Sequence, residues 1–266
     1  MYIHTGYSFT HTNETVGFYK KRAKEVTTLS MRRGSKFNLL SLYGACKCAE
    51  NITIPLRTSI YIGSEFGVVS GVNKVMHSLN EEPVIVMPVD FLNMNGNNAG
   101  FTISKVLHTK GENILMMGSD LTFELTLKVA FAKSKQEKNF SALIGGVDES
   151  VETIDHYQHY MIDQGKEQYD GSCWIYCNNE KENALAKIVS IQNFCDAASL
   201  EVYLAGKTFH KIAYNFLAAS QTGKEYSYGT QSAENIIDLL SCEERDLAYI
   251  SKDRRGRFIL TEIERY

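Results

Sequence analysis

The chain has 266 residues, 44% of them hydrophobic, and a formal net charge of −3. A chain of this length buries one sizeable core, or two fused halves that share one. Charges of both signs are interspersed, which argues against nucleic acid as a partner. No apolar run approaches the roughly 18–20 residues of a membrane span, and the N-terminus shows no secretory pattern. The six cysteines lie among apolar neighbours, which is typical of reduced thiols. We therefore expect a soluble cytoplasmic protein.

The first half of the chain alternates between helical and strand patterns. Apolar residues at helical spacing predict helices over residues 36–49, 68–79 and 99–108. Short apolar or β-branched runs predict strands over residues 58–63, 114–117 and 141–147. Residues 84–87 are expected to form a strand or an extended loop, which Pro88 closes. The strand over residues 114–117 is expected to be buried, because its apolar run is continuous.

The helix predicted over residues 121–133 carries apolar side chains around most of its circumference. A helix of this kind is buried on several sides. A helix layer between two sheets provides such an environment, and we expect this helix to lie in that layer.

The second half repeats the alternation over fewer residues. Strands are predicted over residues 173–177, 184–191 and 202–206, and a helix over residues 232–240 with Ser232 or Thr230 as its cap. Residues 247–250 and 258–260 flank a loop that contains Gly256, as in a hairpin. Strands and helices that alternate in this way predict an α/β architecture.

The turn between residues 117 and 122 is the most informative stretch for function. An apolar run ends at Gly118, and a helix follows directly. Acyl-transfer enzymes place a nucleophile at such a turn, because the helix N-terminus stabilises negative charge there. A cysteine would suit the position, but the residue is Asp120. We expect Asp120 to leave the turn without a nucleophile and to cap the helix, since aspartate is a good N-cap.

Several segments around this turn resemble the thiolase-fold β-ketoacyl synthases. These segments are Asn97-Asn-Ala-Gly100, Gly111-Glu-Asn113 with the apolar run after it, Ser141 to Glu149, and Gly171-Ser-Cys-Trp-Ile. The resemblance implies a thiolase-like, layered α-β-α-β-α fold that is reduced in its second half. It implies a single domain over residues 1–266, with an N-terminal half over 1–155 and a shortened C-terminal half over 156–266.

A narrower resemblance rests on the pattern Gly118-x-Asp120-x-Thr122-Phe123-Glu124. This pattern is similar to that of the short ketosynthase-like proteins of aryl-polyene-type clusters, which are described as chain-length factors and lack the catalytic cysteine. Catalytic members also carry two histidines, or a histidine and an asparagine, from the second half. Residues 202–207 and 226–232 stand where those groups would follow and contain no histidine, although His210 lies close to the first gap.

The resemblance implies a non-catalytic subunit that pairs as a heterodimer with an active β-ketoacyl synthase in polyene, fatty acyl or polyketide elongation. The catalytic partner would supply the cysteine and both acid–base groups, and the complex would receive its acyl chain from an acyl carrier protein. No cofactor or metal is implied. Two alternatives remain open: a stand-alone ketosynthase-like decarboxylase or acyltransferase without a cysteine nucleophile, and a binding module for an acyl carrier or acyl-CoA.

The resemblance also indicates an interface. Residues 91–98 are expected to form an asparagine-rich loop, and the corresponding loop of the resembled fold borders the dimer interface and reaches toward the partner's acyl channel. The candidates for the channel or interface are Phe91, Met94, Asn97, Phe101, Met116, Met117 and Phe123. For each of these residues, ordinary core packing is the alternative.

The remaining motifs carry simpler interpretations. Cys46 and Cys48 point apart on a helix, and Cys173 and Cys177 are expected to pack in the core. His156 and His159 have a spacing that suits a metal on a helix, but their polar flanks favour a surface. The basic turn over residues 254–257 is expected to be a solvated hairpin tip, with docking of an acidic carrier protein as the alternative.

Overall fold

The computed structural model describes residues 1–81, 85–118, 120–151, 169–218 and 228–266. The helices of these ranges are α1 (Val16–Val26), α2 (Lys36–Ala49), α3 (Val69–Glu81), α4 (Pro88–Met94), α5 (Asn97–Leu107), α6 (Thr122–Gln136), α7 (Ala197–Ala205) and α8 (Ser232–Leu240). The strands are β1 (Tyr2–Tyr7), β2 (Thr10–Thr12), β3 (Ser59–Ser64), β4 (Asn113–Met117), β5 (Ser141–Asp148), β6 (Tyr169–Asn178), β7 (Ala186–Phe194), β8 (Lys211–Tyr214), β9 (Asp246–Lys252) and β10 (Phe258–Arg265). No helix within these ranges is long and apolar enough to cross a membrane.

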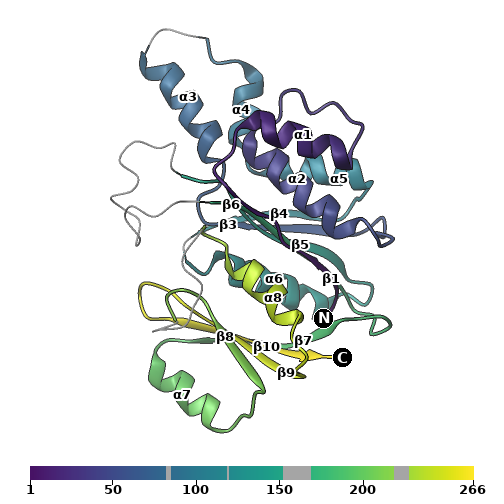
Figure 1. Ribbon diagram of the computed structural model, residues 1–266, viewed down its shortest axis with the longest axis vertical. Coiled ribbons are helices and arrows are strands. Elements are labelled where there is room, and N and C mark those ends of the chain that lie inside the picture. The colour runs from purple at the N-terminus through teal and green to yellow at the C-terminus, as the bar shows by residue number, and fades with distance from the viewer. Residues whose placement is uncertain (82–84, 119, 152–168, 219–227) are drawn as a thin grey trace.

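The described strands follow one hydrogen-bonded path, β4-β3-β5-β6-β1-β7-β10-β9-β8, and β2 pairs with β6. The path bends into two stacked sheets where β1 meets β7 over a short register, from Tyr2 opposite Lys187 to Ile3 opposite Ala186. Helices α1, α2 and α5 cover the outer face of the first sheet, α6 and α8 lie between the sheets, and α7 covers the second (Figure 1). This order of layers confirms the predicted α-β-α-β-α fold.

The second half contributes less to the outer layers than the first. Among the described residues, α7 is the helix that lies on the outside of the second sheet, whereas α1, α2 and α5 lie outside the first (Figure 1). The expected division between residues 155 and 156 lies outside the described residues.

Helix α6 occupies the middle layer, as its apolar circumference predicted. Phe123, Leu127 and Ala130 are fully or almost fully buried and belong to the core between the two sheets. One stripe of the helix differs from the prediction, because Leu125 and Val129 are exposed to solvent. Since these two residues lie four positions apart, they form one continuous apolar ridge on the surface.

Residues 202–206 were predicted as a strand, and this prediction is wrong. Residues 202–205 belong to α7, and Gly206 is its C-cap. The first turn of α7 is capped by Asp196, whose carboxylate accepts a hydrogen bond of 2.8 Å from the backbone N–H of Ser199. Val202 on this helix is 78% exposed, so the apolar run does not reflect burial in a sheet. The helical cap outweighs the β propensity of valine and tyrosine.

Three further expectations for local structure are corrected. Strand β4 lies at the edge of the sheet, where β3 is its partner among the described strands, so residues 114–117 are not a buried strand. The expected loop over residues 91–98 is mostly helical, because Pro88 starts α4 and α5 begins at Asn97. The N-cap of α8 is Gln231 rather than Ser232 or Thr230, and it makes no side-chain capping bond.

The buried carboxylate of Asp170 fastens the N-terminal helices to the first sheet. Its oxygens accept hydrogen bonds from the Tyr19 hydroxyl at 2.7 Å and from the backbone N–H groups of Glu14 and Ser150. The Lys36 ammonium, at the start of α2, lies 2.8 Å from the same carboxylate, and its side chain is also buried. One charged group from β6 therefore fixes α1, α2 and the end of β5.

We expect Asp170→Asn to destabilise the protein by about 3–5 kcal/mol, because it leaves the Lys36 ammonium buried without a counter-charge. The matched control is Glu264→Gln, which breaks the more exposed pair between Arg245 and Glu264 and is expected to cost less than about 1 kcal/mol. Chemical denaturation measures both values. Equal losses in the two variants would contradict the role assigned to Asp170.

Candidate functional site

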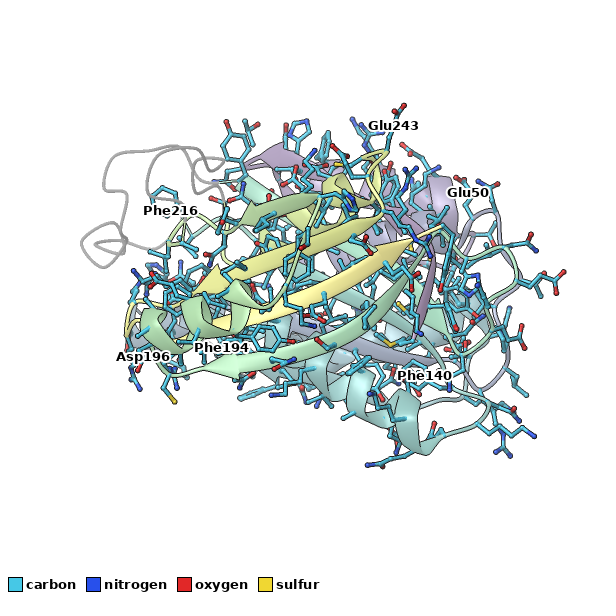
Figure 2. All side chains as sticks on the ribbon, turned by 90° about the horizontal axis from the view of Figure 1, so that it is seen from below. Glu50, Phe140, Phe194, Asp196, Phe216 and Glu243 are labelled. Carbon is cyan, nitrogen blue, oxygen red and sulfur yellow. The ribbon has the colours of Figure 1, made fainter. Side chains whose placement is uncertain are left out.

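The carboxyl ends of the parallel strands β3, β4 and β5 meet at one edge of the first sheet. Ser64 ends β3, and Glu65 follows it; Asp148 ends β5; Asp120 lies three residues after the end of β4. Phe216, which follows β8, lies at this same end of the molecule, opposite the end that carries Phe140 (Figure 2). The fold thus brings three acidic residues of distant sequence position together.

Asp120 is held by the hairpin between β9 and β10. Its carboxylate accepts a hydrogen bond of 3.0 Å from the backbone N–H of Arg254, and the Arg254 Nε lies 3.2 Å from the other oxygen. The same guanidinium lies 3.6 Å from the Glu65 carboxylate. The basic turn is therefore not a purely solvated tip, since Arg254 bridges two acids whose side chains are 9% and 5% exposed.

Asp120 does not cap α6, which corrects the expected N-cap. The N-cap position is Leu121, and it makes no side-chain capping bond. The physical reason is competition: Arg254 engages both carboxylate oxygens of Asp120, one through its backbone N–H and the other through its charged guanidinium. A hydrogen bond to an ionised partner is stronger than one to the neutral backbone N–H of a helix start.

A small cavity adjoins Asp120 and Glu65, the two acids that Arg254 bridges. Its volume is about 30 Å³, which is room for about one water molecule. The described residues that line it are Glu65, Asp120, Asn215, Phe216, Leu217, Tyr228, Gly229, Gln231, Ser232 and Asn235. Carboxylates, amides and hydroxyls make up its polar lining, and these groups hydrogen-bond but do not provide a thiolate.

Three carboxyl groups are completely or almost completely buried near this edge. Asp148 accepts hydrogen bonds from the Ser64 hydroxyl and the Phe66 N–H, and Glu149 accepts them from the N–H and hydroxyl of Ser70. Burial nevertheless raises the pKa of Asp148 to about 6 and that of Glu149 to about 7. Burial at this edge of the sheet therefore favours the protonated forms of Asp148 and Glu149.

Glu124, in the first turn of α6, is the third buried acid. Its carboxylate oxygens have no hydrogen-bond partner of good geometry among the described residues. The hydroxyls of Ser232 and Ser251 lie close enough to favour the charged form, but burial outweighs them and raises the pKa. The direction follows the larger cause, so we take Glu124 to be biased toward its neutral form.

The structure separates the predicted channel or interface residues into buried, half-buried and exposed positions. Phe123 is buried in the core between the sheets. Phe101 on α5 and Met117 at the end of β4 are 61% and 58% exposed, and Phe91 on α4 is also exposed. The others are Met94 and Met116, which are half-buried, and Asn97, which is exposed at the start of α5.

His210 is not brought to the site. It lies before β8, where its Nδ1 is 3.1 Å from the carboxylate of Asp246 at the start of β9. Arg254 follows the end of β9, so His210 and Asp120 lie at opposite ends of that strand. Tyr228 does reach the cavity, and its hydroxyl contacts the thiol of Cys173 at 3.1 Å.

The remaining cysteine and histidine interpretations have mixed outcomes. Cys46, Cys48, Cys173 and Cys177 are buried free thiols, as expected of core residues. His156 and His159 lie outside the described residues. Within the part of the chain that is described, no group of three potential metal ligands gathers in one place.

Sequence reasoning missed the contact between Arg254 and Asp120, and it missed Glu65, the second acid that Arg254 contacts. Glu65 was not considered, although it directly follows a predicted strand whose carboxyl end would lie at the same edge as that of the next parallel strand. The contact with Arg254 spans 134 positions, and no local pattern signals it.

Comparisons with known proteins identify the fold. No family model matches the chain, and no curated protein matches it. Solved structures do match over nearly the whole chain. A chain of the ishigamide ketosynthase/chain length factor superposes with a TM-score of 0.72 at 12% identity, covering 99% of both chains.

Two further structures agree. A chain of the ketosynthase ApeO in complex with its chain length factor ApeC from Xenorhabdus doucetiae gives a TM-score of 0.63 at 12% identity, covering 100% of both chains. A chain of AntDE:AntF, a type II polyketide synthase acyl-carrier protein in complex with its ketosynthase, gives 0.72 at 9% identity, covering 100% of this chain and 99% of the other. The protein therefore has the thiolase-like ketosynthase fold.

The buried acids predict an unusual pH dependence. Because folding raises the pKa of Glu149 from 4.5 to about 7, the folded state binds this proton more tightly than the unfolded chain. The free energy of unfolding should therefore fall as the pH rises from about 4.5 to 7, by on the order of 3 kcal/mol for this group. Glu149→Gln is expected to flatten this fall, as measured by chemical denaturation at stepwise pH.

The control for this experiment is Glu112→Gln. The pKa of Glu112 is lowered by its hydrogen bond to Lys133, so its contribution changes below the same pH window. A Glu149→Gln protein whose stability still falls as steeply as that of the wild type would contradict the assignment.

Proposed function

We propose that this protein is a non-catalytic, chain-length-factor-like subunit that pairs with an active β-ketoacyl synthase. In this heterodimer the partner carries out the condensation of carrier-bound acyl chains, and this chain completes the interface and limits the length of the acyl channel. The observation that carries the proposal is the ion pair between Arg254 and Asp120 at the turn before α6, within a fold shared with ketosynthase/chain length factor structures.

The small volume of the cavity beside Asp120 supports the absence of covalent catalysis. A nucleophile at this turn would need an open approach for a thioester, whereas the cavity of about 30 Å³ is far smaller than the roughly 300 Å³ of the smallest ordinary ligand pockets. The Arg254 side chain lies over Asp120 and joins it to Glu65. An aspartate engaged in this way is not free to attack, and no described histidine lies beside it to take a proton.

The exposed edge of the first sheet supports the pairing. Strand β4 pairs only with β3 among the described strands, and α5 and α6 pack against it. We call the exposed apolar side chains of these three elements the β4 face; they are Phe101, Met117, Leu125 and Val129. An uncovered strand edge next to apolar side chains is typical of a surface that another chain covers.

This proposal explains the surroundings of Asp120 and the exposed β4 face better than the two alternatives do. A stand-alone decarboxylase or acyltransferase would need an open oxyanion site near Asp120, whereas the cavity there has a volume of only about 30 Å³ and Arg254 engages the Asp120 carboxylate. A binding module for an acyl carrier or acyl-CoA would leave the β4 face without a role. Both alternatives predict a chain that works alone, so the isolated protein distinguishes them from the proposal.

We expect the isolated chain, supplied with primed malonyl donors on an acyl carrier protein, to release no condensed product. The same chain co-expressed with a catalytic ketosynthase partner should support condensation. In this complex Asp120→Ala is expected to change the rate less than about threefold, while lowering stability by roughly 1–2 kcal/mol because Arg254 loses its partner. Product analysis by mass spectrometry measures the first effect and thermal denaturation the second.

Substitution of the ketosynthase cysteine by alanine is the control, and it should abolish product formation. Turnover by the isolated chain that disappears in Asp120→Ala would instead identify Asp120 as part of a catalytic site.

The β4 face can be tested separately. We expect Phe101→Glu with Val129→Glu to prevent co-purification with the ketosynthase, because two carboxylates would be buried without partners in the interface. Val202→Glu on α7 is the matched control, since Val202 is more exposed than either residue but lies on the other side of the molecule. Dissociation in the control variant, or retention in the double variant, would place the interface elsewhere.

A further inference from the structure

One segment of this acidic chain carries a large local excess of positive charge. Residues 20–36 contain seven Lys or Arg residues and one Glu, a net charge of +6 in a chain whose net charge is −3. The other 249 residues therefore carry −9. The overall balance conceals this asymmetry, because the segment occupies a small part of the sequence.

The structure arranges this segment as a groove. It runs from the second half of α1 through residues 27–35 to the start of α2, and it contains two adjoining hollows of about 390 and 600 Å³. Lys20 and Arg32 line both hollows, so they join them. We call this surface, from residue 20 to residue 36, the basic groove.

Most cations of the basic groove form no ion pair with a described residue. Lys36 is engaged by Asp170, and Arg22 pairs with Glu25. The other five basic side chains form no ion pair with a described residue; they are Lys20, Lys21, Lys24, Arg32 and Arg33. Unpaired like charges repel one another, so their clustering is an unfavourable arrangement that a negatively charged partner would relieve.

The basic groove lies at the same end of the first sheet as the candidate site. Ser70 lines one of its hollows, and the N–H and hydroxyl of Ser70 bind the Glu149 carboxylate at 2.8 and 2.7 Å. Glu65, five residues earlier, faces Arg254. The short segment over residues 65–70 therefore separates the groove from the charged cluster around Asp120.

We infer that the basic groove docks a small acidic protein domain, the acyl carrier protein that delivers the growing chain; this rests on the proposed function. Charge complementarity carries the identification. A membrane surface or a nucleic acid would extend beyond the groove and meet the remaining charge of −9. A small acidic domain would meet mainly the five cations that form no ion pair with a described residue, because charges farther away than a Debye length of about 8 Å are largely screened. Exposed Leu29 and half-buried Met31 add an apolar floor.

The docking site can be tested in the complex of this chain with its catalytic ketosynthase partner, using the holo-acyl carrier protein of that complex as the probe. We expect Arg32→Glu with Arg33→Glu to raise the KM for the carrier roughly tenfold, with kcat within about twofold, because lost charge attraction weakens encounter rather than chemistry. Added salt should raise the wild-type KM and affect the variant less.

The matched control is Arg57→Glu with Lys138→Glu. These two cations line a hollow at the opposite end of β3 and β5, and their reversal changes the net charge equally. The KM should stay at the wild-type value. An equal rise in both double variants, or no rise in the groove variant, would overturn the inference.

Two further outcomes are separable. If the groove variant loses binding to anionic phosphatidylglycerol vesicles but keeps the wild-type KM for the carrier, a lipid surface occupies the groove and the inference is wrong. If no complex with the ketosynthase forms, the proposed function fails; binding of fluorescently labelled carrier to the isolated chain then decides. A loss of that binding in the groove variant alone would support the inference, and no binding by the wild type would overturn it.

Discussion

Three parallel strands end at one edge of the first sheet, and the chain places acidic side chains at that edge. Buried carboxylates are costly unless they are paired, hydrogen-bonded or protonated. The protein uses each of these solutions: Arg254 pairs with Asp120, the N–H and hydroxyl of Ser70 satisfy Glu149, and burial raises the pKa of Glu124. The local structure of the site follows from how these negative charges are balanced.

The sequence predicted most of the framework because the framework depends on local signals. The apolar circumference of α6 and the continuous apolar run of β5 identified the middle layer and a central strand of the first sheet. Strand β1 was missed, although Ile3 is completely buried, because its polar and aromatic residues give no apolar run. Helix α7 was misassigned because valine and tyrosine favour strands, while the deciding cap at Asp196 precedes the apolar run.

The site was less predictable than the fold. The special position of Asp120 followed from the strand–turn–helix pattern, but its capping role did not hold, because the competing partner Arg254 comes from a hairpin 134 positions away. Sequence patterns report neighbours within a few residues, whereas an ion pair between distant segments depends on the completed topology. For the same reason the expected burial of β4 failed: its apolar run reports hydrophobicity, not which strands lie on either side.

The small cavity and the exposed β4 face have one physical interpretation under the proposed function. An isolated enzyme would be expected to keep a roomy pocket and to cover its apolar surfaces, whereas here Arg254 engages Asp120 beside a cavity of about 30 Å³ and the side chains of the β4 face are exposed among the described residues. Pairing of charges inside the chain stabilises the subunit itself. Burial of the exposed apolar face in a complex would stabilise the heterodimer. The chemistry would then belong to the partner, and the surface charge of this chain would act on the delivery of substrate.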